Sequence, residues 1–278
     1  MVKRGARVRA LYSEKGEGVT SFPEWLLPPE KIGEYRAMTG VALVEIAGRD
    51  SVAAAVKAVQ DRDFTDLIPT YAYTGTEYGA FLSVERAVER LSERLPGTRI
   101  HDLLVTGSPR FWQALNGRFA NELISRYGVF PPCVGCHLYL HSVRIPLSHL
   151  LGGLPLISGE RESHDGTVKI NQIGEALTLY EGLAREFGTE LILPLRHIRD
   201  GNRINDLLGF EWKEGAGQLG CVLSGNYRGV NGAVCMDSAQ VQQYLEEFAC
   251  PVTRRIVGAY IKGRMPDHLK IAAEQIGP

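Results

Sequence analysis

Short apolar strands alternate with segments of helical periodicity through the middle of this chain. Gly40 to Ile46 is a β-branched apolar run, which is typical of a buried parallel strand. It ends in a tight turn, and the alanine-rich segment Val52 to Val59 continues as a helix. Strand, turn and helix together form the βα unit of an α/β fold. The alternation predicts a doubly wound, mostly parallel sheet that binds ligands at the carboxyl ends of its strands.

The remaining elements follow the same pattern. Further strands are predicted at residues 66–73, 100–106, 154–158 and 190–193, and helices at 29–38, 79–95, 111–127, 137–144, 173–187 and 238–248. We expect an N-terminal extension over residues 1–38, a catalytic domain over 39–235, and a C-terminal helix and tail over 236–278.

Composition narrows the class of protein. The 278 residues include 31 Lys and Arg against 32 Asp and Glu, so a strongly basic surface for nucleic acid is not expected over the whole chain. No apolar run is long enough to span a membrane, and the basic N-terminus lacks the apolar core of a signal peptide. An odd number of cysteines, five, favours a reducing, cytoplasmic location. Cys235 and Cys250 are expected to be buried structural residues.

The turn after the first strand is Gly48-Arg49-Asp50-Ser51. Glycine lets the backbone approach a ligand closely, and the N–H groups at the start of the following helix favour an anion. Arg49 and Ser51 would add charged and neutral donors for a phosphate. The alternative is that Asp50 or Ser51 caps the helix and that nothing binds.

This turn resembles the Ser-Gly-Gly-x-Asp-Ser signature of the PP-loop (N-type) ATP pyrophosphatases, which have an adenine nucleotide alpha hydrolase-like (HUP) fold. The resemblance implies that Gly48, Arg49, Asp50 and Ser51 bind the pyrophosphate of Mg-ATP, and that a substrate oxygen attacks the α-phosphorus. Ile46 and Ala47 stand where the family has a serine and its first glycine, which removes one hydroxyl donor and some backbone freedom.

Two later segments follow in the order expected of that family, and the resemblance covers roughly residues 38–230. Ser158 to Asp165 is similar to the segment that closes over the nucleotide, which places Gly159 at the cofactor. Residues 193–209 are similar to a stretch that follows the fifth strand in many members. Catalytic roles are expected for Asp50, for Arg144, and for Asp165 at a strand end.

Cys133 and Cys136 form a Cys-x-x-Cys pair, and Cys221 lies far downstream beside a glycine. Three thiolates can hold a zinc ion or three irons of a [4Fe–4S] cluster. The set resembles that of the cluster-bearing tRNA thiolation enzymes, which implies a [4Fe–4S] cluster that carries sulfur. Three alternatives stay open: zinc completed by Cys221, Cys235, His137 or His141, persulfide chemistry without a metal, and no role for Cys221. Cys235 competes with Cys221 for the third position.

The sequence therefore predicts an ATP-dependent sulfurtransferase that adenylates a nucleobase, a tRNA or a small molecule, in the direction of thiolation or of desulfuration. The same fold also hosts metal-free ligases and amidotransferases, and a nucleotide- or zinc-binding protein without catalysis is a further alternative. The near-neutral charge makes a small-molecule or nucleobase acceptor nearly as well supported as tRNA. A homodimer is compatible with the sequence.

Overall fold

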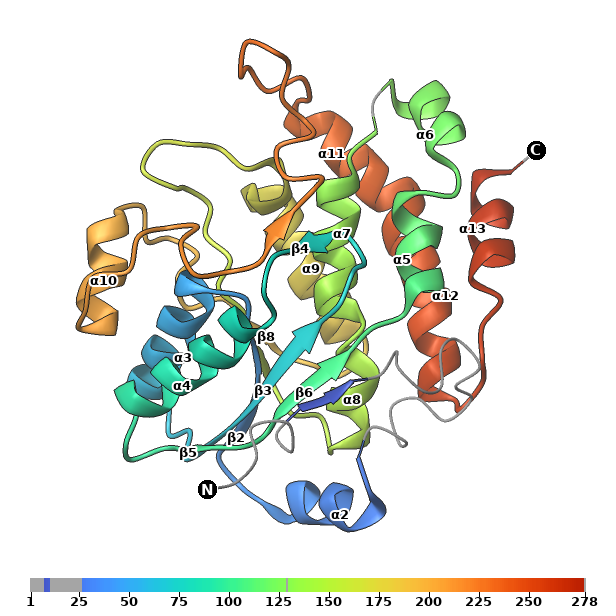
Figure 1. Ribbon diagram of the computed structural model, residues 1–278. Helices are drawn as coiled ribbons and strands as arrows, with labels where there is room; N and C mark the ends of the chain where they lie inside the picture. The colour runs from blue at the N-terminus through green and yellow to red at the C-terminus, as the bar shows by residue number, and fades with distance from the viewer. Residues whose placement is uncertain (1–7, 11–26, 129, 278) are drawn as a thin grey trace.

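A parallel sheet runs through the centre of the molecule (Figure 1). The computed structural model describes residues 8–10, 27–128 and 130–277. Every pairing in this sheet between described strands is parallel. The strands are β1 (Val8–Ala10), β2 (Val41–Glu45), β3 (Asp66–Ala72), β5 (Arg99–Ile100), β6 (Leu103–Thr106), β7 (Leu156–Ile157) and β8 (Leu191–Ile192).

The strand order determines where a ligand can enter. It runs β1-β6-β3-β2-β7-β8, and the short β5 pairs with the first residues of β3. Chain order therefore runs one way from β2 through β3 to β6, and the other way from β2 through β7 to β8. Two neighbouring strands whose connections leave in opposite directions create a crevice at their carboxyl ends. Here that crevice lies between β2 and β7.

Helices cover both faces of the sheet (Figure 1). They are α2 (Pro29–Ala37), α3 (Arg49–Asp61), α4 (Leu82–Arg94), α5 (Pro109–Asn116), α6 (Ala120–Tyr127), α7 (Pro132–Ser142), α8 (Ile145–Leu150), α9 (Gly174–Glu186), α10 (Gly201–Leu208), α11 (Ser238–Tyr244), α12 (Cys250–Ile261) and α13 (His268–Ile276). A 3₁₀ turn spans Ile170–Gln172, and the π-helical segment Leu245–Ala249 joins α11 to α12. Figure 1 shows α3 and α4 on one side of the sheet and α7, α9 and α12 on the other.

The side chains of β2 explain this arrangement. Successive residues of a strand point to opposite faces. Val41 and Leu43 join the core cluster that contains α7, α9 and α12, whereas Ala42 and Val44 join the one that contains α3, α4 and α10. Because both faces are buried, β2 is a continuous apolar run rather than an alternating one. The expected α/β class with a mostly parallel sheet is confirmed, and helices on both faces are compatible with a doubly wound fold.

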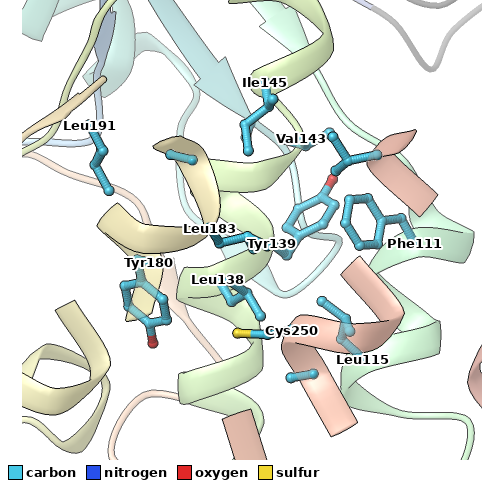
Figure 2. Close-up of a cluster of buried hydrophobic side chains, with 14 of the residues drawn as sticks. Phe111, Leu115, Leu138, Tyr139, Val143, Ile145, Tyr180, Leu183, Leu191 and Cys250 are labelled. Carbon is cyan, nitrogen blue, oxygen red and sulfur yellow. The ribbon is translucent and has the colours of Figure 1, made fainter. Parts of the chain in front are cut away.

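Helix α7 is the central element of the larger core. Figure 2 shows Leu138 and Tyr139 of this helix among Phe111 of α5, Leu183 of α9 and Cys250 of α12. The rings of Phe111 and Tyr139 meet edge-on, with centroids 5.4 Å apart. The helix therefore has little freedom to move, and the side chains in its first turn are held in place.

Local structure differs from the sequence predictions in several places. The helix predicted over 111–127 is two helices, because the chain breaks at Gly117 before α6 begins. The strand predicted over 100–106 is divided into β5 and β6. The cysteine pair lies in the first turn of α7, not before a helix that begins at residue 137. Strand β1 was not predicted.

The C-terminal segment also differs from its prediction. The sequence predicted no helix in the tail after residue 248, but α12 and α13 are regular helices that bury apolar side chains in the larger core. That core includes Ile32 and Tyr35 from the N-terminal segment as well. Both flanking segments thus share a core with residues 39–235, although residues 1–7 and 11–26 of the predicted extension lie outside the described residues. Cys250 is buried as expected, whereas Cys235 is exposed.

Among the described residues, none of the helices combines the length and the apolarity needed to cross a bilayer.

Candidate functional site

A cavity of about 540 Å³ lies at the carboxyl ends of β2 and β7. This is the crevice where the strand order reverses, the usual ligand site of open α/β sheets. Its volume is in the range of small-molecule and cofactor sites. The turn after β2, the segment after β7, the first turn of α7 and the chain around β9 (Gly220–Cys221) all line it.

The turn after β2 is stabilised by hydrogen bonds of the Ser51 side chain. The hydroxyl of Ser51 accepts hydrogen bonds from the N–H groups of Ala47 and Gly48 at 2.9 and 3.0 Å, and donates to the carbonyl of Gly48 at 2.7 Å. The turn leads directly into α3, whose first N–H groups have no intrahelical partner. The side chain of Gln218 lies so close to Gly48 that an added Cβ would be 2.2 Å from its amide oxygen. The turn therefore presents a glycine and a helix N-terminus to the cavity, as an anion site requires.

Gly159 brings the end of β7 into direct contact with this turn. A Cβ added at Gly159 would lie 2.6 Å from the backbone nitrogen of Ser51 and 2.8 Å from its Cα. Backbone atoms cannot rotate away as a flexible side chain could. Only glycine therefore permits the two strand ends to meet here, which makes them one continuous wall of the cavity.

Five charged side chains surround the start of α3, and we call them the loop cluster: Arg49, Asp50, Arg161, Lys169 and Glu214. Arg49 contacts Asp50 at 2.8 Å and Glu214 at 3.0 Å, and Arg161 contacts the same two carboxylates at 2.9 and 3.1 Å. Lys169 lies 3.0 Å from Glu214. Three cations thus face two carboxylates, and one positive charge is in excess at a helix N-terminus, which favours a bound anion.

Glu214 is held ionised by this cluster. Hydrogen bonding to His164 and the positive charge of Lys169 outweigh partial burial and hold the pKa of the Glu214 carboxyl well below its usual range. The carboxylate therefore serves as a permanent negative anchor for the surrounding cations, and it is one of the side chains that line the cavity.

Three thiols line the same cavity. Cys133 and Cys136 belong to the first turn of α7, and Cys221 belongs to β9, which pairs with β4 (Glu77–Tyr78). The Sγ of Cys133 lies 2.8 Å from the Oδ1 of Asn226, in the segment that follows β9. Figure 1 shows β9 beside the upper part of α7. Cys235 is exposed and is not among the residues that line the cavity.

The thiols of Cys133 and Cys136 are not activated by their surroundings. Burial, followed by the proximity of Cys221, raises the pKa of Cys133 to about 11, and burial also raises that of Cys136. The indole N–H of Trp112 points at the sulfur of Cys136 at 3.4 Å and only partly offsets this effect. Unpaired thiolates in this place are therefore unfavourable, and a positively charged centre is what would stabilise them.

A second charged group lies between the sheet and α7, and we call it the α7 cluster: Glu45, His137, His141, Arg144 and Glu160. His141 is inserted between two carboxylates, with its Nδ1 3.1 Å from Glu45 and its Nε2 3.3 Å from Glu160. His137 lies 2.6 Å from Glu160, and Arg144 lies 3.7 Å from Glu45. Glu45, His137 and Glu160 line the cavity.

Mutual attraction keeps Glu45, His141 and Glu160 charged despite their burial. Burial opposes ionisation of Glu45, but Arg144 and His141 outweigh it and hold its pKa at about 2. Burial likewise opposes the charge on His141, but Glu45 and Glu160 outweigh it and raise its pKa to about 9. The pKa of Glu160 is lowered, against burial, by His137 and His141. Each charge is therefore retained because its partners are present.

The structure brings together most of the residues singled out from the sequence. Gly48 to Ser51, Gly159 and the cysteines 133, 136 and 221 all line one cavity. Arg144 and Asp165 do not line it. Arg144 is buried against the sheet and donates to the hydroxyl of Thr70 at 2.7 Å. Asp165 adopts a positive φ of 51° and accepts a hydrogen bond from the N–H of Gly201, so it shapes the loop before α10.

Glu45, Lys169 and Glu214 were missed, and His137 and His141 were named only as alternative zinc ligands. Glu45 is a charged residue inside an apolar strand, and the pair His137 and His141 has the i, i+4 spacing of one helix face. Both signals were present in the sequence. Lys169 and Glu214 carried none, since they lie in irregular segments and meet the site only through the tertiary fold.

No family model matches the chain. The chain is 41% identical over 241 residues to an uncharacterized protein of Methanocaldococcus jannaschii, MJ0009, and the match covers 85% of this chain and 86% of that protein.

Proposed function

This chain belongs to the same family as the archaeal protein MJ0009, and we propose for it an ATP-dependent transfer of sulfur to a nucleobase or a small-molecule carbonyl. The observation that carries the proposal is that the anion-binding turn 48–51 and the three thiols line one cavity. An activated carbon and a sulfur-carrying group could then meet without either leaving the protein.

Three features support nucleotide binding at the turn, and with it the PP-loop (HUP) fold. The cavity lies where the strand order reverses, at the carboxyl ends of β2 and β7. The helix N-terminus and the excess positive charge of the loop cluster both favour a polyphosphate. Asp50 and Glu214 supply carboxylates beside that position, which suits the Mg²⁺ that accompanies ATP.

The thiols fit an iron–sulfur cluster better than a single zinc ion. Zn–S bonds of about 2.3 Å place two sulfurs of a tetrahedral site about 3.8 Å apart. Among the described residues, the groups of three ligand atoms that lie within 4.8 Å of one another include no cysteine. In a [4Fe–4S] cluster each thiolate binds a different iron, so wider spacing is required. Cys133, Cys136 and Cys221 would hold it.

The proposed reaction replaces a carbonyl oxygen by sulfur. The substrate oxygen attacks the α-phosphorus of ATP, the bond to the bridging oxygen breaks, and pyrophosphate leaves. A sulfide then adds to the adenylated carbon, and AMP departs with the former carbonyl oxygen. ATP activates the oxygen as a leaving group, which is why we assign the direction as thiolation. When bound, a three-cysteine cluster supplies an iron without a protein ligand that can carry sulfide.

The chain's own residues position the two reactants. The turn 48–51 and Lys169 hold the phosphates at one wall, and the first turn of α7 keeps the thiols at the other. Helix α7 is fixed by its packing against α5, α9 and α12, so the separation between the walls is set by the fold.

The test is anaerobic purification followed by iron and sulfide analysis and assays for AMP and pyrophosphate. We expect about four irons and four sulfides per chain, and AMP release that depends on a thiolatable substrate and sulfide. Cys133→Ala, Cys136→Ala and Cys221→Ala should each lose the cluster. The matched control Cys235→Ala should keep it, because that thiol is outside the cavity. Full iron content in all three cavity variants would refute the cluster, and an absence of ATP binding would refute the proposed function.

A further inference from the structure

Three side chains of the α7 cluster form a group of metal-ligand type that the proposed sulfur transfer does not use. His137 and His141 lie one turn apart on α7, and Glu160 follows β7. Their ligand atoms all lie within 4.8 Å of one another. We propose that His137, His141 and Glu160 bind a zinc ion at the wall of the cavity.

The distances fit a divalent ion with little rearrangement. Bonds of about 2.1 Å in tetrahedral geometry separate two ligand atoms by about 3.4 Å. The Nε2 of His141 and the Oε1 of Glu160 are already 3.3 Å apart. The Nδ1 of His137 is 2.6 Å from the same oxygen and would have to withdraw by less than about 1 Å. His137 is partly exposed at the cavity and has room to do so.

Unpartnered polar atoms point to a missing ligand. The Oε2 of Glu160 is buried and has no hydrogen-bond partner among the described residues, and the buried Nε2 of His141 has only the ion-pair contact with the Oε1 of Glu160, without a well-formed hydrogen bond. The two side chains are only 2% and 4% exposed. Buried polar atoms without partners are uncommon, because each costs about 1–3 kcal/mol. A cation between them would satisfy both.

The surroundings also resemble those of bound zinc. A zinc-ligating histidine usually gives its second ring nitrogen to a carboxylate, which fixes its orientation. The Nδ1 of His141 lies 3.1 Å from Glu45, and Glu45 is in turn held by Arg144. Arg144 is anchored to the hydroxyl of Thr70 on β3 at 2.7 Å. The ring of His141 is therefore oriented before any ion arrives.

The ligand set determines the kind of site. Two histidines and one glutamate are the protein ligands of several catalytic zinc sites, in which the fourth position stays open. Here His137 and Glu160 line the cavity, so the open position would face it and accept water or a substrate oxygen. This inference does not depend on the proposed sulfur transfer, because it uses none of the three thiols.

Metal titration with two probes tests the site. Zn²⁺ binding is measured on the full chain with its metals removed, and Co²⁺ binding is followed by visible absorption. We expect one tight site whose bound cobalt shows ligand-field bands. The triple variant Cys133→Ala/Cys136→Ala/Cys221→Ala should retain this site, and its cobalt spectrum should show no thiolate charge-transfer absorption. His137→Gln should weaken zinc binding by at least about 100-fold, and Glu45→Gln by about 10–100-fold.

The matched control is His149→Gln, which changes an exposed histidine at the end of α8 and should leave zinc affinity unchanged. Circular dichroism on each variant confirms that it is folded. The proposal is overturned if the folded His137→Gln protein binds zinc as the wild type does, if zinc binding disappears in the folded triple cysteine variant, or if the wild-type chain binds no zinc. These outcomes are separate from the ATP and AMP measurements that test the sulfur transfer.

Discussion

The loop cluster and the α7 cluster lie on the same cavity but differ in the sign of the charge that is in excess. The loop cluster holds three cations against two carboxylates, and Lys169 and Glu214 remain partly open to solvent. In the α7 cluster two carboxylates face one arginine, so one negative charge is balanced only by the histidines. The first therefore favours an anion, and the second favours a proton or a metal ion.

The two clusters also differ in burial, and substitutions in them should therefore affect ligand binding and folding stability to different extents. Exposed ion pairs contribute little to folding, because water already solvates both partners. Buried pairs contribute little net energy when intact but cost several kcal/mol when one partner is removed. We therefore expect removal of the buried Arg144 from the α7 cluster to act mainly on folding, and exposed substitutions in the loop cluster to act mainly on nucleotide affinity.

The largest expected effect is that of Arg144→Met. Arg144 is wholly buried, and its removal leaves Glu45 charged without its cation, which should cost about 3–5 kcal/mol of unfolding free energy in urea denaturation. Arg62→Met is the control, since Arg62 pairs with Glu190 at the surface and should cost less than about 1 kcal/mol. The double variant Glu45→Gln/Arg144→Met should recover part of the loss. Equal costs for Arg144→Met and Arg62→Met would contradict the comparison.

A second buried histidine shows what the carboxylates of the α7 cluster do. The exposed fraction of His268 is 4%, similar to the 2% of His141. Burial and the positive charge of Arg110, however, lower the pKa of His268 to about 4. Its ring is hydrogen-bonded to the hydroxyl of Tyr260. The unfolded chain binds a proton near pH 6.5 that the folded chain takes up only near pH 4, so stability falls as the pH decreases through this window.

Between about pH 7 and pH 5 this histidine should account for a loss of about 2 kcal/mol. Urea denaturation at both pH values measures it, with His268→Gln as the comparison because glutamine can still accept the hydrogen bond from Tyr260. The variant should lose less stability over the same pH range than the wild type. An identical pH dependence in both proteins would show that His268 does not titrate as described.

Gly159→Ala tests the contact that joins the two strand ends. The new methyl would overlap the backbone of Ser51, and overpacking of this kind costs about 1–3 kcal/mol. Because the turn must shift, we also expect ATP binding to fall below detection in calorimetry. Gly182→Ala is the matched control: no atom lies within 4 Å of its added Cβ, and in the middle of α9 it should stabilise by about 0.5–1 kcal/mol. Normal ATP affinity in Gly159→Ala would mean that the turn is not the phosphate site.

The sheet and part of the site could be predicted from the sequence, because their signals are patterns of neighbouring residues. The apolar run that leads to the turn at Gly48 and the cysteine pair three residues apart are each a pattern within one element, and the turn and the cysteine pair line the cavity. Gly117 did not reveal the helix break, because a single glycine is tolerated inside many helices. The ion pair of His141 with Glu45 joins positions 96 residues apart, so only tertiary packing brings them together. Pairing across such separations has no local signature.

Lys169→Met should change the free energy of unfolding least among these substitutions. It tests whether the loop cluster acts on nucleotide affinity rather than on folding. Lys169 is 33% exposed and pairs with a partly exposed carboxylate, so we expect a stability change below about 1 kcal/mol. Lys169 lines the cavity in which we propose that the phosphates bind, and its loss should weaken ATP binding about tenfold at low salt, with a smaller difference at high salt. Lys57→Met is the control, because Lys57 is 30% exposed and pairs with Asp61 at the far end of α3. If both variants bind ATP equally well, the excess charge of the loop cluster does not act on the nucleotide.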